Sequence, residues 1–352
     1  MAAVDATTGM LLYTTTTDWN PVAAAVDERT GHVFVVNNGA SSVTMLDGRS
    51  GCILHTVSPA TMNGSLVVAV AERSGRAFVP CPGGVDVLAT ANGQLLHTVS
   101  WPASASSVVA IAVDERTSRV FAVSSGAVSM LNAATGTLQR TVTIGRFARA
   151  VAVDERTNRV FVAGSGGVGS AGTGVVSVLD ATTGVIMRTI SVDRFPWAIA
   201  VDDRTDRVFV TSPATGRVDV LEATSGRLLR AVSLGPQTAA IAVDARRGHV
   251  FVTDVGLQDR PLHFVNSGTA QVGMLDARTG EVLRTLNMAD HATVASIAVD
   301  ERTGHLFVAT IPGSRSDGWD GMAQGIRRWL PWFPGSTPRS VRGTVSTLTI
   351  AY

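Results

Sequence analysis

The residues of this chain best suited to acid–base, nucleophilic or metal chemistry are seven histidines and two cysteines. Cys52 and Cys81 form no CxxC pair, so they predict neither a metal site nor a disulfide and are interpreted as isolated small hydrophobic residues. Five histidines recur at repeated positions, which leaves His263 and His291. These two, with Asp290 beside His291, are the candidates for catalysis, which requires groups within hydrogen-bond reach of one substrate proton.

A second group of residues is suited to binding. Tryptophan stacks on planar groups, and arginine pairs with anions through a flat guanidinium. Such residues interrupt the repeat just before the strands predicted to lie innermost, where Arg149 also occurs. The predicted ligand-binding residues are Trp19, Asn63, Trp101, Arg146, Arg194, Trp197 and Gln237. The alternative is that a tryptophan here only fills the end of a channel or covers a junction between repeats.

The composition narrows the class of protein. Of 352 residues, 45% are hydrophobic, 16% are charged and 35 are glycine, which is typical of a folded, turn-rich chain. All 29 basic residues are arginine and balance 28 acidic residues to a net charge of +1, which argues against a nucleic-acid partner. No apolar run approaches the roughly 18 residues of a membrane span, and residues 1–19 lack the pattern of a signal peptide. The compartment stays open between cytoplasmic and the trimmed form of an exported protein.

One motif recurs seven times along the chain. It has the form AVDERTGHVFV, as at 25–35, and a second motif of the form VTMLDGRSGCILHTV, as at 43–57, alternates with it. The repeats are 40 to 56 residues apart, anchored at Val26, Val70, Val113, Val153, Val201, Val243 and Val299. In both motifs, runs of alternating apolar residues flank a polar turn, which predicts two hairpins per repeat. Seven four-stranded units at this spacing predict a seven-bladed β-propeller as a single all-β domain over residues 1–352.

The two ends of the chain are predicted to close the ring together. The segment 4–16 precedes the first complete repeat, and Leu11–Thr15 is the predicted outer strand of the last blade. The segment 345–350, VSTLTI, is the predicted third strand of the same blade. The recurring aspartates, such as Asp27, are predicted to cap turns rather than to form a metal ring, and no metal or cofactor is expected.

These repeats, with VDERTGHVFVVN and VTMLDGRSG in the first unit, resemble the YVTN-type bacterial β-propeller family. Phenylalanine replaces the tyrosine of the namesake tetrapeptide, as in Phe34, and only the first unit ends in asparagine, at Asn37. The resemblance covers nearly the whole chain except 311–343. It implies surface-associated binding or scaffolding, while some similar seven-bladed proteins are lactonases or lyases.

The repeat also separates two faces of the predicted ring. The short, nearly identical DERTG and DATTG turns share one face, and every insertion falls on the other. The largest insertion is 311–343, which with 254–271 is interpreted as a lid; the alternative is a structural flap. Trp329, Trp332 and Phe333 within it are candidates for a protein partner, and 326–333 for weak membrane-surface contact.

Two classes of function follow from this pattern. The first is a non-enzymatic binding or interaction propeller that holds a small molecule, glycan or protein on the variable face. The alternative is a lactonase- or lyase-like enzyme with its active site at the same end of the channel, where His291, Asp290, His263 and the arginines would act.

Overall fold

A computed structural model gives the arrangement of the chain. It describes residues 1–58, 67–81, 83–100, 108–124, 126–144, 147–165, 173–234, 238–254, 269–290 and 292–312. These residues form 28 strands in seven four-stranded antiparallel sheets.

The sheets are numbered here as blades 1 to 7 in order round the ring. Blade 1 consists of β3 (Pro21–Asp27), β4 (His32–Asn37), β5 (Ser42–Asp47) and β6 (Ile53–Val57). Blade 2 consists of β7 (Ala69–Ala71), β8 (Arg76–Cys81), β9 (Gly84–Ala89) and β10 (Leu95–Ser100). Blade 3 consists of β11 (Val108–Asp114), β12 (Arg119–Ser124), β13 (Ala127–Asn132) and β14 (Leu138–Thr143). Blade 4 consists of β15 (Ala148–Asp154), β16 (Arg159–Ser165), β17 (Gly174–Asp180) and β18 (Ile186–Val192). Blade 5 consists of β19 (Ala198–Asp202), β20 (Arg207–Ser212), β21 (Arg217–Glu222) and β22 (Leu228–Ser233). Blade 6 consists of β23 (Thr238–Asp244), β24 (His249–Asp254), β25 (Thr269–Asp276) and β26 (Val282–Asp290). Blade 7 consists of β27 (Ala292–Asp300), β28 (His305–Pro312), β1 (Ala2–Asp5) and β2 (Leu11–Thr14).

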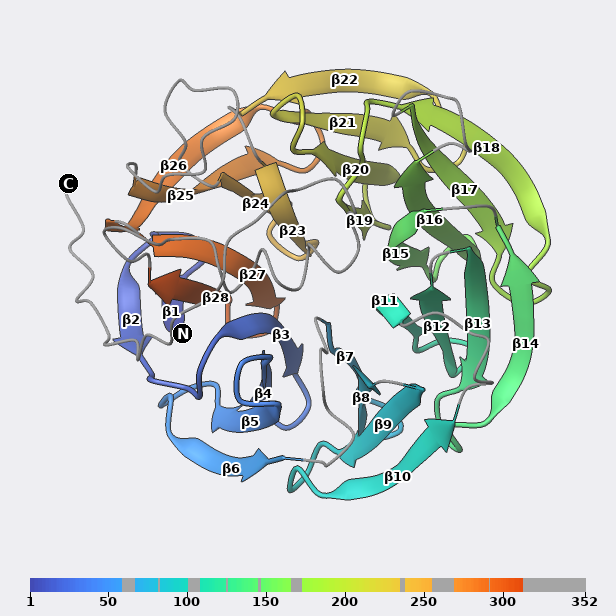
Figure 1. Ribbon diagram of the computed structural model, residues 1–352. Coiled ribbons are helices and arrows are strands. Elements are labelled where there is room, and N and C mark those ends of the chain that lie inside the picture. Colours follow the sequence, from blue (N-terminus) through green and yellow to red (C-terminus); the bar gives the residue numbers. More distant parts are fainter. Residues whose placement is uncertain are drawn as a thin grey trace, which may run out of the picture.

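The blades stand round a common axis, with β3, β7, β11, β15, β19, β23 and β27 innermost (Figure 1). Each inner strand contacts the inner strands of the neighbouring blades. The predicted seven-bladed β-propeller is therefore confirmed, with two hairpins in every blade. Within the part of the chain that the structure describes, no helix is long and apolar enough to cross a membrane.

Blade 7 closes the ring with the first residues of the chain. β1 pairs with β28 from Ala2 opposite Val308 to Asp5 opposite His305, and β2 pairs with β1. The outer strand was predicted correctly, but the assignment of 345–350 as the third strand was wrong, because β1 occupies that position. Residues 345–350 themselves lie outside the described residues.

The core lies between blades. Each repeat buries one phenylalanine completely at the centre of its second strand, and each packs on apolar residues of a neighbouring blade. The seven are Phe34, Phe78, Phe121, Phe161, Phe209, Phe251 and Phe307. Since every blade covers the face of the next, no blade can bury its apolar side chains alone.

In six blades the turn between the first and second strands is fixed by its leading aspartate, and in blade 2 this residue is Ala71. Asp27 is buried, and its Oδ1 accepts a hydrogen bond from the Thr30 backbone N–H at 3.0 Å. The fifth residue of this turn has a positive φ in all seven blades, including 53° at Ser118 and 59° at Asp206. The predicted turn-capping role of the aspartates is confirmed for Asp27, Asp114, Asp154, Asp202, Asp244 and Asp300.

Carboxylates link these turns from blade to blade. Glu28 N–H donates to Glu72 Oε1 at 2.8 Å, and Glu115 N–H donates to Glu155 Oε1 at 2.7 Å. The series continues through Glu72 to Glu115, Glu301 to Glu28 and Ala245 to Glu301. Within the described residues it is interrupted in blades 5 and 6, where the shorter Asp203 and Ala245 replace glutamate. We call Glu28, Glu72, Glu115, Glu155 and Glu301 the carboxylate ring.

The carboxylate ring predicts an unusual dependence of stability on pH. Burial, assisted by repulsion from neighbouring carboxylates, raises the pKa of all five glutamates above the ordinary 4.5. In the window just above 4.5 the folded protein therefore binds more protons than the unfolded chain, and its stability is expected to rise as the pH falls from neutral towards 4.5. Below about 3.8 it should fall again, because turn hydrogen bonds lower the pKa of carboxyls such as Asp47 and Asp276.

Melting temperature measured against pH tests this expectation. Glu72→Gln and Glu115→Gln keep the acceptor oxygen but do not titrate, so the double variant should show a smaller rise on acidification. A wild-type melting temperature that falls steadily from neutral pH downwards would contradict the prediction.

A second set of inter-blade contacts lies at the outer rim. Tyr13 Oη donates to the Gly48 carbonyl at 2.7 Å, and Arg230 Nη1 donates to the Thr279 carbonyl at 3.2 Å. The corresponding residues of the other blades are His55, His97, Arg140, Arg188 and Arg284. Each follows a bulge in its outer strand, which redirects the side chain towards the next blade. These contacts support a structural role for His55 and His97.

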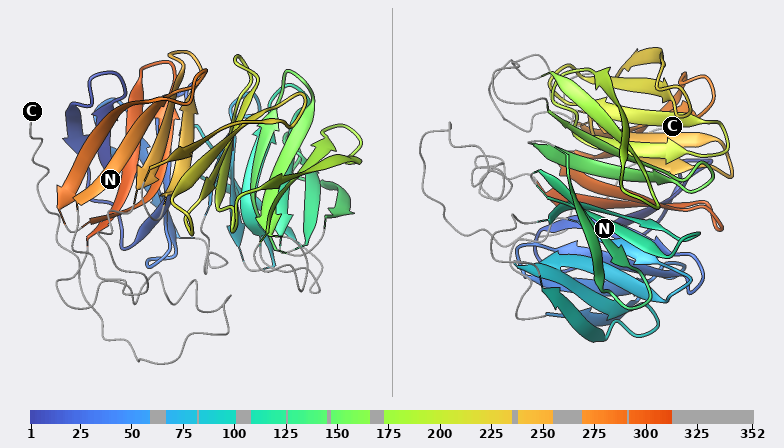
Figure 2. Two further views of the ribbon diagram at one scale, coloured as in Figure 1. Left: turned by 90° about the horizontal axis from the view of Figure 1, so that it is seen from above. Right: turned by 90° about the vertical axis from the view of Figure 1, so that its right-hand side faces the viewer.

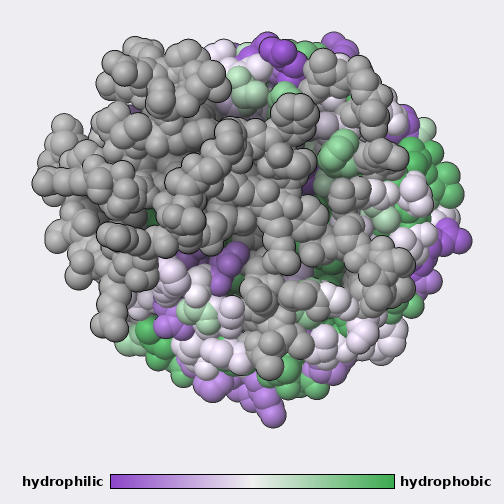
Figure 3. All heavy atoms as spheres, viewed as in Figure 1, coloured by the Kyte–Doolittle hydropathy of each residue, from purple (hydrophilic) through white to green (hydrophobic). Residues whose placement is uncertain are grey.

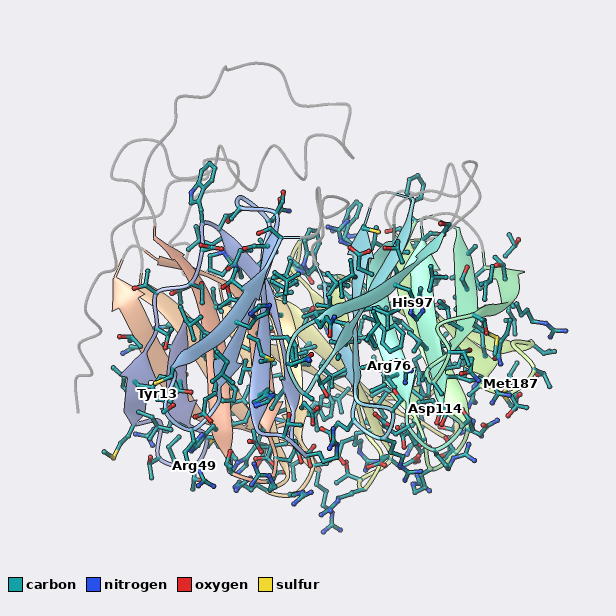
Figure 4. All side chains as sticks on the ribbon, turned by 90° about the horizontal axis from the view of Figure 1, so that it is seen from below. Tyr13, Arg49, Arg76, His97, Asp114 and Met187 are labelled. Carbon is teal, nitrogen blue, oxygen red and sulfur yellow. The ribbon has the colours of Figure 1, made fainter. Side chains whose placement is uncertain are left out.

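Apolar side chains also reach the rim. Met187 on β18 is exposed at the outer edge, whereas Arg49 and Asp114 lie towards the face that carries the short turns (Figure 4). In the space-filling view, apolar residues are visible at the rim over the outer strands (Figure 3).

Candidate functional site

The two faces of the ring are built differently. The strands of each blade run between the faces (Figure 2), so the turns after first and third strands lie on one face, which we call the turn face. The segments that lead into the inner strands lie on the opposite, variable face. Hydrogen bonds between blades hold the turn face together, as described above, so side chains free to recognise another molecule are sought on the variable face.

Solvent reaches the axis of the ring. Ala112, Ala152 and Ala200 lie on inner strands and are only half-buried. The second strand covers one edge of each inner strand, and the neighbouring blades cover its two faces, so the remaining exposure is towards the axis. The inner strands therefore line an axial space that solvent enters.

A repeated bulge marks this end of the inner strands. In blade 4, Ala148 pairs with Gly164 and Ala150 with Ala163, which leaves Arg149 without a partner in the ladder. Such bulges redirect a side chain, and they are frequent beside functional sites. In the described residues this position of the repeat holds Val22, Val109, Arg149, Trp197, Ala239 and Ala295. The ladder is bulged there in blades 1, 3, 4, 6 and 7, whereas Trp197 lies directly before β19. Among these six described positions, only those of the adjacent blades 4 and 5 hold large polar or aromatic side chains.

Arg149 and Trp197 stack on each other across the blade junction. The Arg149 guanidinium carbon lies 3.3 Å from the centroid of the Trp197 ring, which is a close cation–π contact. The surrounding protein lowers the pKa of Arg149 to about 10, yet the residue remains exposed. The lowered pKa and the exposure of Arg149 are both expected for a side chain at the variable-face end of an inner strand, where protein lies close to it on some sides and water reaches it on others. At neutral pH the guanidinium keeps its charge.

Three exposed aromatic side chains stand beside this pair in sequence or in repeat position. Trp19 is 59% exposed, Phe147 55% and Phe195 53%. Phe147 and Phe195 have φ values of 66° and 54°, and Asn20, next to Trp19, has 59°. A left-handed backbone is strained for a bulky residue, and such strain is concentrated at functional sites.

Carboxylates anchor two of these loops. Asp18 Oδ2 accepts a hydrogen bond from Ser42 Oγ at 2.7 Å, and Asp193 Oδ2 accepts one from Thr215 Oγ1 at 2.6 Å. Burial opposes the ionised form of Asp193, but hydrogen bonds from Thr215 and Arg194 and the charge of Arg217 together lower its pKa. Hydrogen bonds to Ser42 and Thr215 therefore fix the loops before β3 and β19 to other parts of their own blades. Trp19 and Phe195 lie on these restrained loops.

The predicted binding residues fall into two groups. Trp19, Arg194 and Trp197 are on the variable face, where Arg194 is exposed beside Asp193 and Trp197 contacts Arg149. The others lie outside the described residues, or only their backbone is described: Asn63, Trp101, Arg146, Gln237, His263, Asp290, His291, Trp329, Trp332 and Phe333. Their predicted roles, and most of the lid at 311–343, stay predictions. Among the described residues no group of three or more His, Cys, Asp or Glu side chains could hold a metal ion.

The sequence signal for the Arg149–Trp197 pair is its place in the repeat. Both residues occupy a position that holds valine or alanine in four of the other blades. The sequence therefore indicates that they are unusual, but it does not show that they touch. That contact depends on the bulge and on the order of blades round the ring.

Comparison with known proteins agrees with this architecture. Residues 1–158 match the family model described as outer membrane protein assembly factor BamB. The chain is a β-propeller. A solved structure from hydrazine synthase of Kuenenia stuttgartiensis superposes with a TM-score of 0.66 at 13% identity, over 87% of this chain and 99% of that one. At that identity the likeness shows the fold alone, and no curated protein matches the sequence. These comparisons support a β-propeller repeat family, although not the YVTN-type family in particular.

Proposed function

We propose that this protein is a non-enzymatic binding or interaction propeller that holds a small molecule, glycan or protein on its variable face. The observation that carries the proposal is the set of exposed aromatic side chains Trp19, Phe147 and Phe195 beside the inner strands, with left-handed backbone at Phe147, at Phe195 and at Asn20 next to Trp19. Rigid, exposed aromatic residues offer a large contact area at a small cost in conformational entropy.

The two faces of the ring use their side chains differently, which supports this proposal. The turn face uses its charged side chains for contacts between blades, whereas the loops before β3, β15 and β19 depart from the repeat. The matched family model is described as an assembly factor, which is in keeping with a propeller that works by holding other molecules. A YVTN-type surface-associated role belongs to the same proposal.

The position at which β28 ends bears on the predicted role of the segment after it. β28 begins at the turn face with His305 and ends at Pro312, so the chain leaves blade 7 on the variable face. Residues 313–352 follow in the sequence and include Trp329, Trp332 and Phe333. A lid or a partner-binding role for this segment is part of the proposal.

Ligand screening with matched variants tests the surface. Purified protein would be melted with a panel of sugars, aromatic anions, aromatic amines and lactones, since a ligand that binds only the folded state raises the melting temperature. For each ligand found, the double variant Trp19→Ala, Phe195→Ala should weaken binding tenfold or more, about 1.4 kcal/mol.

The control variant is Met187→Ala, Leu228→Ala, which removes two equally exposed apolar side chains from outer strands. Binding that survives the variable-face variant unchanged, or that the rim variant weakens equally, would contradict the proposal. Turnover of a lactone by the wild type would instead favour the lactonase-like alternative.

A further inference from the structure

The Arg149 guanidinium carries a charge without a counter-charge. The described residues offer it no hydrogen-bond acceptor and no ion pair, and its one specific contact is the face of Trp197. Burial alone accounts for its lowered pKa, with no contribution from a carboxylate. Other arginines of the described chain, such as Arg156 with Asp206 and Arg247 with Asp244, do have acidic partners.

The stack fixes how this charge is presented. At 3.3 Å from the guanidinium carbon to the ring centroid, an edge-on guanidinium would push a nitrogen into the indole, so the group must lie nearly flat on the ring. It then uses its face for the contact and leaves its N–H groups directed outwards in its own plane. Two of those N–H groups match the two oxygens of a carboxylate, with the geometry of a bidentate pair. The half-buried Trp197 holds the plane in place, so little side-chain entropy remains to be lost when an anion binds.

The neighbouring bulge positions are apolar. Val109 in blade 3 and Ala239 in blade 6 flank the Arg149–Trp197 pair and are half-buried, as are Val22 and Ala295 further round the ring. The corresponding position in the other described blades therefore holds a small aliphatic residue and no second charge. One positive charge among apolar positions is complementary to a small anion with an apolar body.

We propose that Arg149 and Trp197 form a binding site for a small organic carboxylate, whose carboxyl group pairs with the outward edge of the guanidinium while its apolar body lies along the axis. This inference rests on the proposed function, because it names the class of ligand for one part of the variable face. It assigns Arg149 as the residue that selects for negative charge and Trp197 as the residue that positions it.

Isothermal titration with benzoate tests the site, with benzamidine and benzyl alcohol as cationic and neutral ligands of the same shape. The wild type should bind benzoate at least tenfold more tightly than either, and added salt should weaken that binding. Arg149→Gln should lower benzoate affinity tenfold or more, and Arg149→Lys should recover only part of it. Arg49→Gln removes an equal charge from the turn face and should have no effect.

The outcomes separate this inference from the broader proposal. Equal affinity for benzyl alcohol and benzoate, no measurable benzoate binding, or an Arg149→Gln variant with wild-type affinity would overturn the anion site. If a neutral ligand bound and only Trp19→Ala, Phe195→Ala weakened it, the variable face would stand without the anion site. If benzoate binding depended on Arg149 but not on Trp19 or Phe195, the result would support the anion site and contradict the proposed role of the exposed aromatic residues. Melting temperatures of the variants, each altered at an exposed position, verify that they are folded.

Discussion

Replacing Phe209 by alanine is expected to lower the free energy of unfolding by about 3–5 kcal/mol, the usual cost of removing a fully buried aromatic ring. Phe209 on β20 is fully buried and packs with Val218 and Val220 of its own blade and with Val250 and Leu275 of blade 6. The loss therefore weakens the junction between two blades as well as the blade itself.

Urea unfolding followed by far-ultraviolet circular dichroism gives the measurement. Met187→Ala is the control, because Met187 is 53% exposed and its removal should change stability by no more than about 0.5 kcal/mol. A Phe209→Ala protein as stable as this control would mean that the blades do not depend on the phenylalanine layer.

Deleting residues 1–15 is expected to abolish the closed ring. The deletion removes β1 and β2, leaves blade 7 with two strands, and exposes the edge of β28. It also removes Met1 and Ala3 from the cluster that buries Phe307 and Val33. An open edge beside uncovered apolar residues invites pairing with another chain, so the product should aggregate or melt at a much lower temperature.

Size-exclusion chromatography with a thermal melt distinguishes the outcomes. Met10→Ser changes an exposed residue between the two strands and keeps both, so it should behave as the wild type. A truncated protein that stayed monomeric with an unchanged melting temperature would show that another segment, such as 345–350, can fill the third position of blade 7.

Ring closure is also where the sequence was least informative. The segment VSTLTI has the alternation of a third strand, and AAVD at 2–5 is shorter and begins at the edge of the chain. Periodicity identifies strand-like segments, but it does not decide which of two such segments pairs with β28. By contrast, the seven repeats predicted the two hairpins of every blade, because the fifth residue of both turns has a left-handed backbone in every blade and an aspartate caps the first turn in six of them.

The candidate site was predictable only in part. Trp19, Arg194 and Trp197 were singled out because they break the repeat, and the structure places them on the variable face. The stack of Trp197 on Arg149 was not predictable, since it joins side chains 48 positions apart through a bulge in one strand and the neighbourhood of two blades. The proposed anion site also depends on the fact that Arg149 has no carboxylate partner among the described residues. No pattern of residue types in the sequence shows whether a charged side chain has such a partner.

The place of Arg149 and Trp197 in the repeat would make the proposed recognition transferable. All seven blades repeat the same inner strand, and the hydrogen bonds that link neighbouring blades lie at the turn face or at the rim. Exchanging the two side chains for those at the same positions of two other adjacent blades would carry the pair to a different sector of the ring, with the scaffold unchanged. A ring of this kind can therefore acquire or lose a specificity in two substitutions and relocate it in four, and relatives with the same fold need not share a ligand.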